Sequence, residues 1–227
     1  MSKRIIVVTE GQSETNFIKT VLSEHFARKD IYLEPRTIVT SIDKRSGKVF
    51  KGGLSSFDKL LVTLTPAIKQ AMKSPDCYVT TMIDFYKLPS DTPGFDKVNE
   101  IQSPYEKVQF IENEIKNSLK LEKDIFIPYI QLHEFEALLF SDISLLKDSY
   151  FEDKYDISPL LKCAEEISNP EMIDNGEDTA PSKRILKCIP CYNKPVAGVS
   201  VCSKIGVDKM RSKCSHFDEW LVKLENV

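Results

Sequence analysis

Acidic residues follow three separate apolar runs of this 227-residue chain, and their positions suggest chemistry at a phosphate. If the runs are parallel strands of one sheet, their carboxyl ends meet at one edge, where ligands of open α/β sheets usually bind. Carboxylate oxygens there are hard ligands that suit Mg²⁺ or Mn²⁺. Such an ion activates water and neutralises charge at a phosphate. The acids are Glu10 and Glu14, then Asp84, then Glu134 and Glu136.

Glu10 and Asp84 are the acids on which this expectation depends most. Glu10 ends a short β-branched run and is followed by Gly11, whose tight turn could bring Glu14 back toward Glu10. Asp84 comes directly after the apolar run 78–83. Two strands that deliver acids to one edge predict a divalent-metal site.

Each acid also has a structural explanation. Carboxylates favour helix N-termini, so any one of them could be a helix cap or simply be solvated. Glu136 could equally be a solvated partner of a nearby lysine. Three acidic groups at the same expected edge favour the metal site for the set as a whole.

Apolar periodicity places these acids on alternating strands and helices, with Ser13 as the expected N-cap of the first helix. This β-α-β-α-β-α-β order predicts an α/β fold with a mostly parallel sheet flanked by helices. Pro35 is expected to break the second strand, and Pro128 marks an edge or a bulge in the fourth. Strands are expected at 5–8, 31–40, 78–83 and 125–130, and helices at 13–26, 57–72 and 108–119.

The last part of the chain has a different, helical pattern. We expect an α/β domain at 1–140 and a helical C-terminal region at 141–227, packed together as one unit. The segment 195–201 is the one candidate strand there, and Trp220 is expected to pack on the core. Helical patches occur at about 142–148, 158–168, 179–188, 200–212 and 215–225.

Bulk composition is that of an ordinary globular protein. Hydrophobic residues make up 41% and charged residues 29%, which excludes a disordered chain. The net charge of −3 gives no global signal for nucleic acid, although local patches can still bind it. The apolar runs are too short for a signal peptide or a membrane span, so we expect a cytoplasmic protein without membrane contact.

Six motifs follow one another in order and together span nearly the whole chain, although each motif alone is weak. They are Val7–Glu14, Lys51–Gly53, Ile83–Pro89, Gln131–Phe140, Ala180–Arg184 and Cys214–Leu221. This ordered set resembles the TOPRIM domain of topoisomerases, primases and OLD-type ATPase–nuclease proteins, so the α/β domain expected at 1–140 would be TOPRIM-like. It is most similar to a small stand-alone TOPRIM-like family encoded beside ABC-type ATPases in bacterial anti-phage operons.

This resemblance implies a Mg²⁺- or Mn²⁺-dependent nuclease in which Glu10 is the central catalytic acid and metal ligand. Asp84 would hold the metal and Glu14 would assist. The second aspartate of the family's Asp-x-Asp pair is Tyr86 here, and a phenol is a poor Mg²⁺ ligand at neutral pH. We hypothesise that Glu134 or Glu136 replaces it; otherwise one metal binds weakly until substrate completes the site.

The resemblance also implies partners and a biological role. The expected substrate is nucleic acid, with RNA or tRNA favoured over DNA, and the expected partner is an ABC/OLD-type ATPase that restrains a toxic effector until infection. The active form could be a homodimer. Two alternatives are a catalytically silent TOPRIM-like module that regulates the ATPase, which Tyr86 favours, and another phosphotransfer enzyme such as a nucleotidyl transferase.

Basic residues supply candidate phosphate contacts. Cations aimed at a phosphate stabilise the charge that develops during transfer, although each could also lie on a solvated helical face. Lys183 and Lys194 are the catalytic candidates. The candidates for binding a nucleic-acid backbone are Lys48, Lys51, Gly52, Gly53, Arg184 and Arg211.

Six cysteines complete the chemically notable residues, and in a cytoplasmic protein they are expected to be reduced. Cys188 and Cys191 form a Cys-x-x-Cys pair that invites a zinc interpretation together with Cys202, Cys214 and His216. The spacing is irregular and only one such pair exists, so ordinary buried cysteines are favoured over zinc.

Overall fold

The structure is a computed structural model that describes residues 2–42, 49–51, 53–86, 88–150, 154–173, 176 and 178–227. For residues 40–42 and 49–51 it describes the backbone alone. Lys48 and Gly52, two of the expected nucleic-acid contacts, lie outside the described residues. Of Lys51, only the backbone is described.

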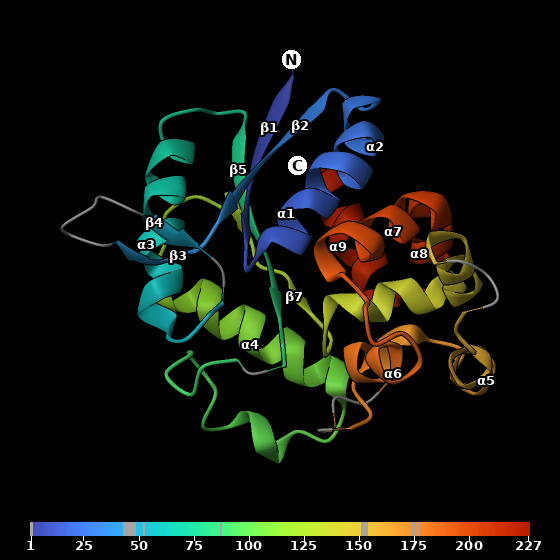
Figure 1. Ribbon diagram of the computed structural model, residues 1–227. Coiled ribbons are helices and arrows are strands. Elements are labelled where there is room, and N and C mark those ends of the chain that lie inside the picture. The colour runs from blue at the N-terminus through green and yellow to red at the C-terminus, as the bar shows by residue number, and fades with distance from the viewer. Residues whose placement is uncertain are drawn as a thin grey trace.

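A parallel sheet forms the centre of the molecule (Figure 1). The strand order is β2-β1-β5-β6, with β7 also paired to β5, and every pairing in this sheet is parallel. The prediction of an α/β fold with a mostly parallel sheet is therefore confirmed, and the arrangement is consistent with a TOPRIM-like, Rossmann-type fold. The strands are β1 (Lys3–Thr9), β2 (Ile31–Thr37), β5 (Cys77–Asp84), β6 (Phe126–Ile127) and β7 (Ile130–Gln131).

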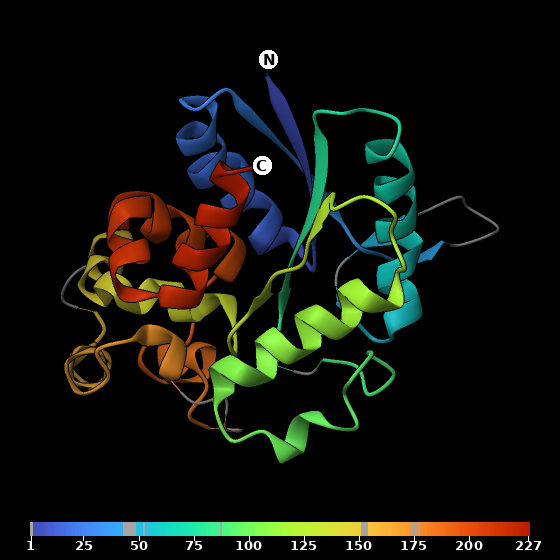
Figure 2. The ribbon, with the colours of Figure 1, turned by 180° about the vertical axis from the view of Figure 1, so that it is seen from behind.

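The central strand β1 shows why helices cover both faces of the sheet. Its side chains alternate between faces. Ile5 and Val7 belong to one buried hydrophobic cluster, and Ile6 and Val8 belong to the other. The first face is covered by α1 (Gln12–Phe17), the π-helical turn η1 (Ile18–Leu22), α2 (Ser23–Ala27) and much of the C-terminal region. The second face is covered by α3 (Phe57–Ala71) and α4 (Pro104–Ser118), as Figure 2 shows from behind.

The C-terminal region is helical throughout its described part. Trp220 packs face to face with Tyr129 at 4.2 Å between ring centroids, and its indole N–H donates to Thr80 Oγ1 at 2.8 Å, so the last helix is fixed on the sheet as expected. The elements are the 3₁₀ segment η3 (Phe135–Ser149), α5 (Ser158–Glu166), η4 (Pro170–Met172), α6 (Pro181–Cys188), the π-helical turn η5 (Lys194–Gly198), α7 (Val199–Ile205), α8 (Val207–Lys213) and α9 (Ser215–Glu225).

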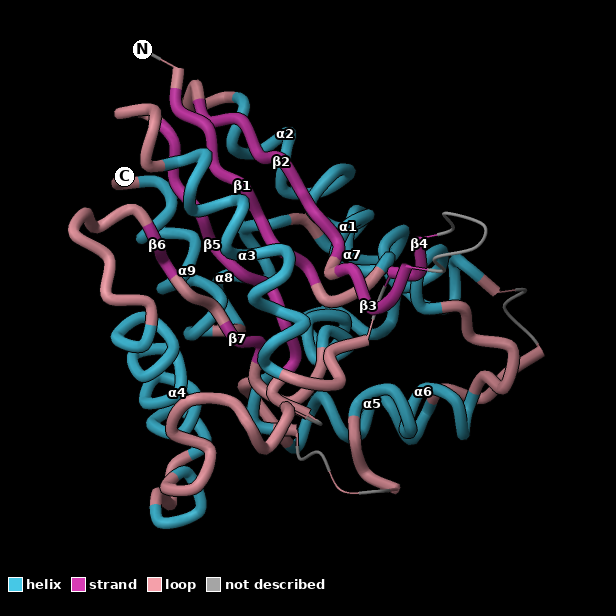
Figure 3. The backbone as a smooth tube through the Cα atoms, turned by 90° about the vertical axis from the view of Figure 1, so that its left-hand side faces the viewer, coloured by secondary structure: helices cyan, strands magenta, loops and turns pink. Residues whose placement is uncertain are grey.

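The two prolines expected to affect strands behave differently. Pro35 does not break β2. Because β2 is an edge strand, a residue without a backbone N–H is tolerated there, and the pairing with β1 continues through Thr37. Pro128 does interrupt the fourth strand, which is divided into β6 and β7 (Figure 3). Both short strands pair with β5 in one continuous register, so no residue is inserted as a bulge. Because β6 stands at the end of the strand order, Pro128 follows an edge strand, which is one of the two expected positions.

Three further expectations need correction. The segment 195–201 is helical, because Pro195 stands in the first turn of η5 and α7 follows directly. The N-cap of α1 is Gly11 rather than Ser13. The second strand, expected at 31–40, ends at Thr37, and an antiparallel hairpin of β3 (Val39–Ile42) and β4 (Val49–Lys51) follows it.

None of the helices in the described part of the chain is both long and apolar enough to cross a membrane.

Candidate active site at the strand ends

Backbone hydrogen bonds tie the three acidic segments together at the carboxyl edge of the sheet. Glu10, directly after β1, accepts from the N–H of Asp84 at 3.2 Å and from the N–H of Leu54 at 3.4 Å. Asp84, the last residue of β5, accepts from the N–H of Phe135 at 3.0 Å. Parallel strands thus bring together acids that are 74 and 51 residues from their hydrogen-bond partners in the chain.

Glu14 has a capping role as well as a place in the site. It is the third residue of α1, and its Oε2 accepts from the N–H of Gly11 at 2.8 Å in a capping box. A Cβ at Gly11 would lie 3.1 Å from this oxygen, so glycine leaves room for the turn. The other oxygen, Oε1, lies 3.4 Å from Nζ of Lys194.

Lys194 lies among the carboxylates. Its Nζ is 3.0 Å from Glu136 Oε2, 3.4 Å from Glu14 Oε1 and 3.6 Å from Asp84 Oδ2. The ammonium also lies 5.5 Å from the ring centroid of Phe135. We name Glu10, Glu14, Asp84, Glu136 and Lys194 the strand-end cluster.

The turn that carries Lys194 is anchored to the N-terminal helix. Asn16, on α1, donates its side-chain N–H to the carbonyl oxygen of Pro195 at 3.2 Å. Lys194 and Glu14 therefore approach each other from elements that are about 180 residues apart in the chain but in direct contact. This contact explains how a lysine of the C-terminal region reaches an acid of the first helix.

Burial dominates the electrostatics of the strand-end cluster. It raises the pKa of Glu10, of Asp84 and of Glu136 above the ordinary carboxyl values. The pKa of Asp84 is raised well above its ordinary value, because Asp84 is buried and also faces the like charges of Glu14, Glu10 and Glu136. Lys194 opposes these shifts in Asp84 and Glu136.

Lys194 itself is strongly biased toward the charged form. Burial alone would favour the neutral amine, but Asp84, Glu136 and Glu14 outweigh it and raise the pKa of Lys194 well above its ordinary value. Four carboxylates nevertheless face one ammonium. The ionised cluster is therefore left with excess negative charge in a partly desolvated position.

Tyr192 is a neighbour of the cluster that the sequence did not point to. Its hydroxyl is buried, and within the described part of the chain it has no hydrogen-bond partner. A Cβ at Gly198 would lie 2.5 Å from this oxygen, so only glycine accommodates the phenol there. Burial raises the pKa of Tyr192, and the charge of Glu136 raises it further. Only its place two residues before Lys194 could have marked it.

The donor set of the cluster fits a hard divalent cation. Carboxylate oxygens in excess over positive charge are what such an ion would satisfy. Glu10, Asp84 and Glu136 are the residues that would hold it. In the present arrangement, however, no three acidic, His or Cys side chains of the described residues are placed to hold a metal jointly. Lys194 provides the counter-charge instead.

Glu134 has a structural partner. Its Oε2 accepts from the N–H of Ser182 at 3.0 Å, in the first turn of α6, so it satisfies one of the free N–H groups at that helix end. Tyr86, where a second metal-binding acid was expected, donates its backbone N–H to the carbonyl of His133 at 2.9 Å. Of the two candidate replacements for this acid, Glu136 is thus the one that belongs to the strand-end cluster, through its contact with Lys194.

The other basic candidates lie in different surroundings. Lys183 is exposed on α6. Arg184 donates to the carbonyl of Thr179 at 2.6 Å, just before α6. Arg211 is ion-paired with acids of α9, its partners being Asp218 at 2.5 Å and Glu225 at 2.7 Å.

Gly53 is the described one of the two glycines that were expected to contact a nucleic-acid backbone. It is exposed and has a φ of +80°, a left-handed conformation that favours glycine whether or not a ligand approaches.

The cysteine motif does not gather around a histidine. Cys191 is exposed, and its sulfur lies 3.2 Å from the hydroxyl of Tyr155. His216 is buried, and its Nε2 lies 2.9 Å from Glu112 Oε1. The described residues include no group of three metal-binding side chains around these cysteines.

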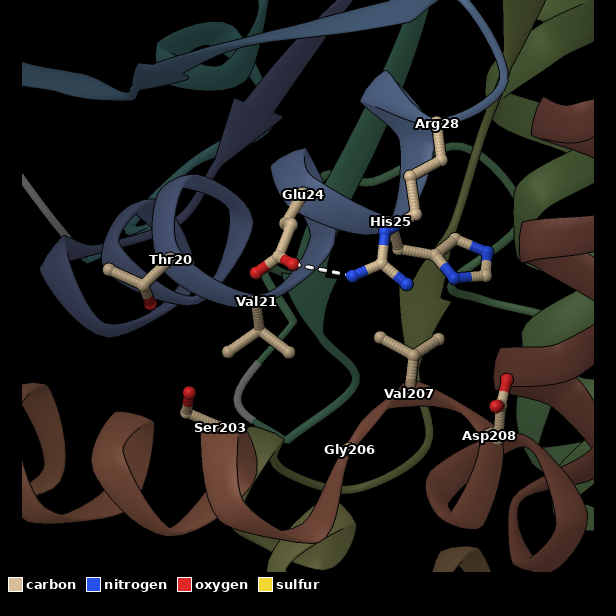
Figure 4. A pocket seen from close by; sticks show the side chains of 9 residues that line it. All are labelled: Thr20, Val21, Glu24, His25, Arg28, Ser203, Gly206, Val207 and Asp208. Atoms are coloured by element: carbon tan, nitrogen blue, oxygen red, sulfur yellow. Dashed lines mark hydrogen bonds and ion pairs between the residues drawn. The ribbon is translucent and has the colours of Figure 1, made fainter.

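A separate cavity of about 220 Å³ lies between η1 and α2 on one side and α7 and α8 on the other (Figure 4). Two of its charged residues, Glu24 and Arg28, form an ion pair at 2.6 Å. His25 also lines it, and this ring lies 2.8 Å from Glu225. No residue of the strand-end cluster lines this cavity.

Comparison with known proteins identifies the family of this α/β protein. The chain belongs to the family described as "Domain of unknown function (DUF4276)", whose model matches residues 9–225. The matched region includes every residue of the strand-end cluster. No curated protein and no solved structure matched the chain.

Proposed function

We propose that this protein is a divalent-cation-dependent nuclease whose active site is the strand-end cluster. The observation that carries the proposal is the convergence of Glu10, Asp84 and Glu136 at the carboxyl edge of a parallel sheet, around one lysine. Buried acids that are not neutralised by their surroundings are typical of functional sites rather than of packing. The resemblance of the sequence to TOPRIM nucleases supports phosphodiester hydrolysis as the reaction.

The residues of the cluster divide the work. Glu10, Asp84 and Glu136 would hold Mg²⁺ or Mn²⁺, which when bound supplies Lewis-acid stabilisation of charge on a phosphoryl oxygen. Glu14 Oε1 or Glu10 accepts the proton of the attacking water. Glu14 is favoured for this role because both Glu10 oxygens already accept backbone N–H groups. Lys194 stabilises the phosphate, and its position in the cluster favours it over the exposed Lys183.

The substrate and the biological role rest on the family resemblance. We propose RNA or tRNA as the substrate, and a toxic effector role in anti-phage defence. A partner ATPase of the ABC/OLD type would restrain the effector in the cytoplasm, and the active form would be a homodimer. Lys183, Arg184 and the residues around Gly53 would contact the nucleic-acid backbone.

A catalytically silent module that regulates an ATPase is the second candidate. Two observations favour it. Tyr86 replaces an expected metal-binding acid, and the described carboxylates surround an ammonium rather than a position ready for a metal. In that case the cluster would serve the stability of the strand ends or the recognition of a basic partner.

A cleavage assay separates the two candidates. The full chain, together with its partner ATPase and a phage trigger, is incubated with RNA and with DNA in the presence of Mg²⁺, Mn²⁺ or EDTA. The nuclease predicts cleavage that requires the metal, is lost in Glu10→Gln and persists in Glu219→Gln, which changes an exposed acid of α9. Equal product from the wild type and Glu10→Gln would exclude the strand-end cluster as the active site, and no cleavage under any condition would favour the silent module.

A further inference from the structure

The position of the Lys194 ammonium is unusual for a residue that would only contact substrate. It lies within 3.0–3.6 Å of carboxylate oxygens from three elements: α1, β5 and η3. Acids that would bind a cation are therefore already bridged by one. The ammonium occupies the place in the cluster where positive charge has the most carboxylate neighbours.

Replacement of this ammonium by a divalent ion is electrostatically favourable. One positive charge faces four carboxylates, so a doubly charged ion would neutralise more of the cluster. The side chain of Lys194 is 30% exposed, whereas those of Glu14 and Glu136 are 5% and 2% exposed. The lysine, on its flexible four-carbon chain, is thus the member of the cluster that can move toward solvent.

The backbone that carries the lysine is held in place independently of the ammonium. Asn16 binds the carbonyl of Pro195, and Gly198 packs directly against the hydroxyl of Tyr192. Movement of the ammonium therefore requires rotation of the Lys194 side chain and no unfolding of η5.

We propose that Lys194 is an internal counter-cation that competes with the divalent ion for the strand-end carboxylates. Without metal, the ammonium keeps the acids together. When the ion binds, the ammonium is displaced and becomes available to a phosphate beside the site. This inference rests on the proposed metal-dependent function and adds a regulatory step to it, because the resting protein binds metal more weakly than its carboxylates alone would.

The competition predicts that one substitution has opposite effects on affinity and on activity. Lys194→Met removes the competing charge, so metal binds more tightly, while cleavage falls because the phosphate loses its cation. Lys194→Arg keeps the charge and should bind metal nearly as the wild type does. A residue that merely shaped the site would weaken both properties together.

Calorimetric titration of the metal-free full-length protein with Mn²⁺, at fixed pH and salt, measures the competition. We expect Lys194→Met to lower the Kd about tenfold or more. Lys204→Met is the matched control. It removes a lysine of α7 that is paired with Asp148, away from the strand-end cluster, and should leave the Kd unchanged. Lys194→Gln is the second variant, and it should also tighten binding. Thermal melting with and without Mn²⁺ shows that each variant is folded.

A measurement on the wild type tests the displacement without substitution. Reductive methylation of Lys194, quantified by peptide mass spectrometry, should increase when saturating Mg²⁺ is present. Methylation that stays constant would contradict displacement.

The outcomes separate this inference from the proposed function. If the wild type binds Mn²⁺ and the folded Lys194→Met or Lys194→Gln binds it equally or more weakly, the competition is wrong and the metal site stands. If neither the wild type nor these variants bind Mn²⁺, the metal site itself is wrong and the competition fails with it.

Discussion

Two groups of buried carboxylates in this protein are satisfied in opposite ways. The first is the strand-end cluster. The second, which we name the helix-anchoring cluster, consists of Glu112, Glu171, Tyr105 and His216. Glu171 is fully buried and accepts from the N–H groups of His216 and Phe217 at 2.9 and 3.0 Å and from the hydroxyl of Tyr105 at 2.9 Å.

Glu112 is satisfied in the same manner. Its Oε1 accepts from the N–H of Ile130 at 2.7 Å and lies 2.9 Å from Nε2 of His216. Together these contacts attach the start of α9 to α4, to η4 and to the strand β7. The two carboxylates of the helix-anchoring cluster are thus surrounded by hydrogen-bond donors.

The neighbours of each carboxylate explain the difference. Burial raises the pKa of Glu171, but its further neighbours are donors that lower it. Burial also raises the pKa of Asp84, but there three other carboxylates raise it further. One cluster uses negative charge to fix helices, and the other retains negative charge that the fold does not neutralise. The fold is expected to lose stability when an acid of the first kind is removed, and activity when an acid of the second kind is removed.

The largest effect is expected from Glu10→Gln. We expect cleavage to fall about a thousandfold, because a central charged group of the site is lost. The free energy of unfolding should change little, because the amide keeps one of the two backbone N–H bonds while the substitution removes one of several mutually repelling charges. Single-turnover cleavage and urea unfolding measure the two quantities. A stability loss that accounts for the lost activity would mean that Glu10 belongs with the structural acids.

Glu171→Ala is expected to do the reverse. It leaves two buried N–H groups without their acceptor and removes one of the two partners of the Tyr105 hydroxyl, which should cost about 3 kcal/mol of unfolding free energy. The folded fraction should bind Mn²⁺ with unchanged affinity. Glu219→Ala is the control, because it removes an exposed acid of α9, the helix whose start Glu171 holds. Weaker metal binding in folded Glu171→Ala would show that the two clusters are not independent.

The sequence allowed prediction of the strand-end cluster but not of the helix-anchoring one. Glu10 and Asp84 follow apolar runs whose periodicity marks strands, and parallel strands bring their ends to one edge. Glu171 follows Asn169-Pro170 in a polar segment, and Glu112 is one acid among several on an amphipathic helix. Nothing local distinguishes them, because their partners are 18 to 104 residues away.

The position of Lys194 illustrates the same limit within the site. Its residue type suggested a phosphate contact, but its carboxylate neighbours depend on how η5 packs on α1, which no periodicity encodes. The N-cap of α1 was misassigned for a related reason. Ser13 is the usual capping residue type, but Glu14 supplies the side-chain bond to the backbone N–H of Gly11 instead.

Glu134 and Glu136 provide a comparison within one short segment. Glu134→Ala should cost about 1 kcal/mol of stability, because α6 loses an acceptor at its first turn. Glu136→Ala should instead weaken Mn²⁺ binding, because Glu136 is one of the carboxylates of the strand-end cluster that would hold the ion. Urea unfolding and Mn²⁺ titration of both variants measure these effects. Unchanged Mn²⁺ affinity in both variants would remove this segment from the site.

The smallest expected effect concerns pH. The raised pKa of Asp84 means that its protonated form favours the folded state, and this contribution is lost as the pH rises through the folded-state pKa. Asp84→Asn should therefore stabilise the metal-free protein above that pKa, with a gain that shrinks as the pH is lowered through it. Thermal melting of both proteins across pH 5–9 tests the sign; a gain that grows on acidification would contradict the shift.

The most direct measurement of the central claim is an Mn²⁺ titration followed by electron paramagnetic resonance, on the metal-free wild type, Asp84→Asn and Glu171→Gln. A strand-end metal site predicts saturable binding in the wild type, affinity reduced about tenfold or more in Asp84→Asn, and unchanged affinity in Glu171→Gln. The absence of saturable binding in the wild type, or equal binding by Asp84→Asn, would contradict it.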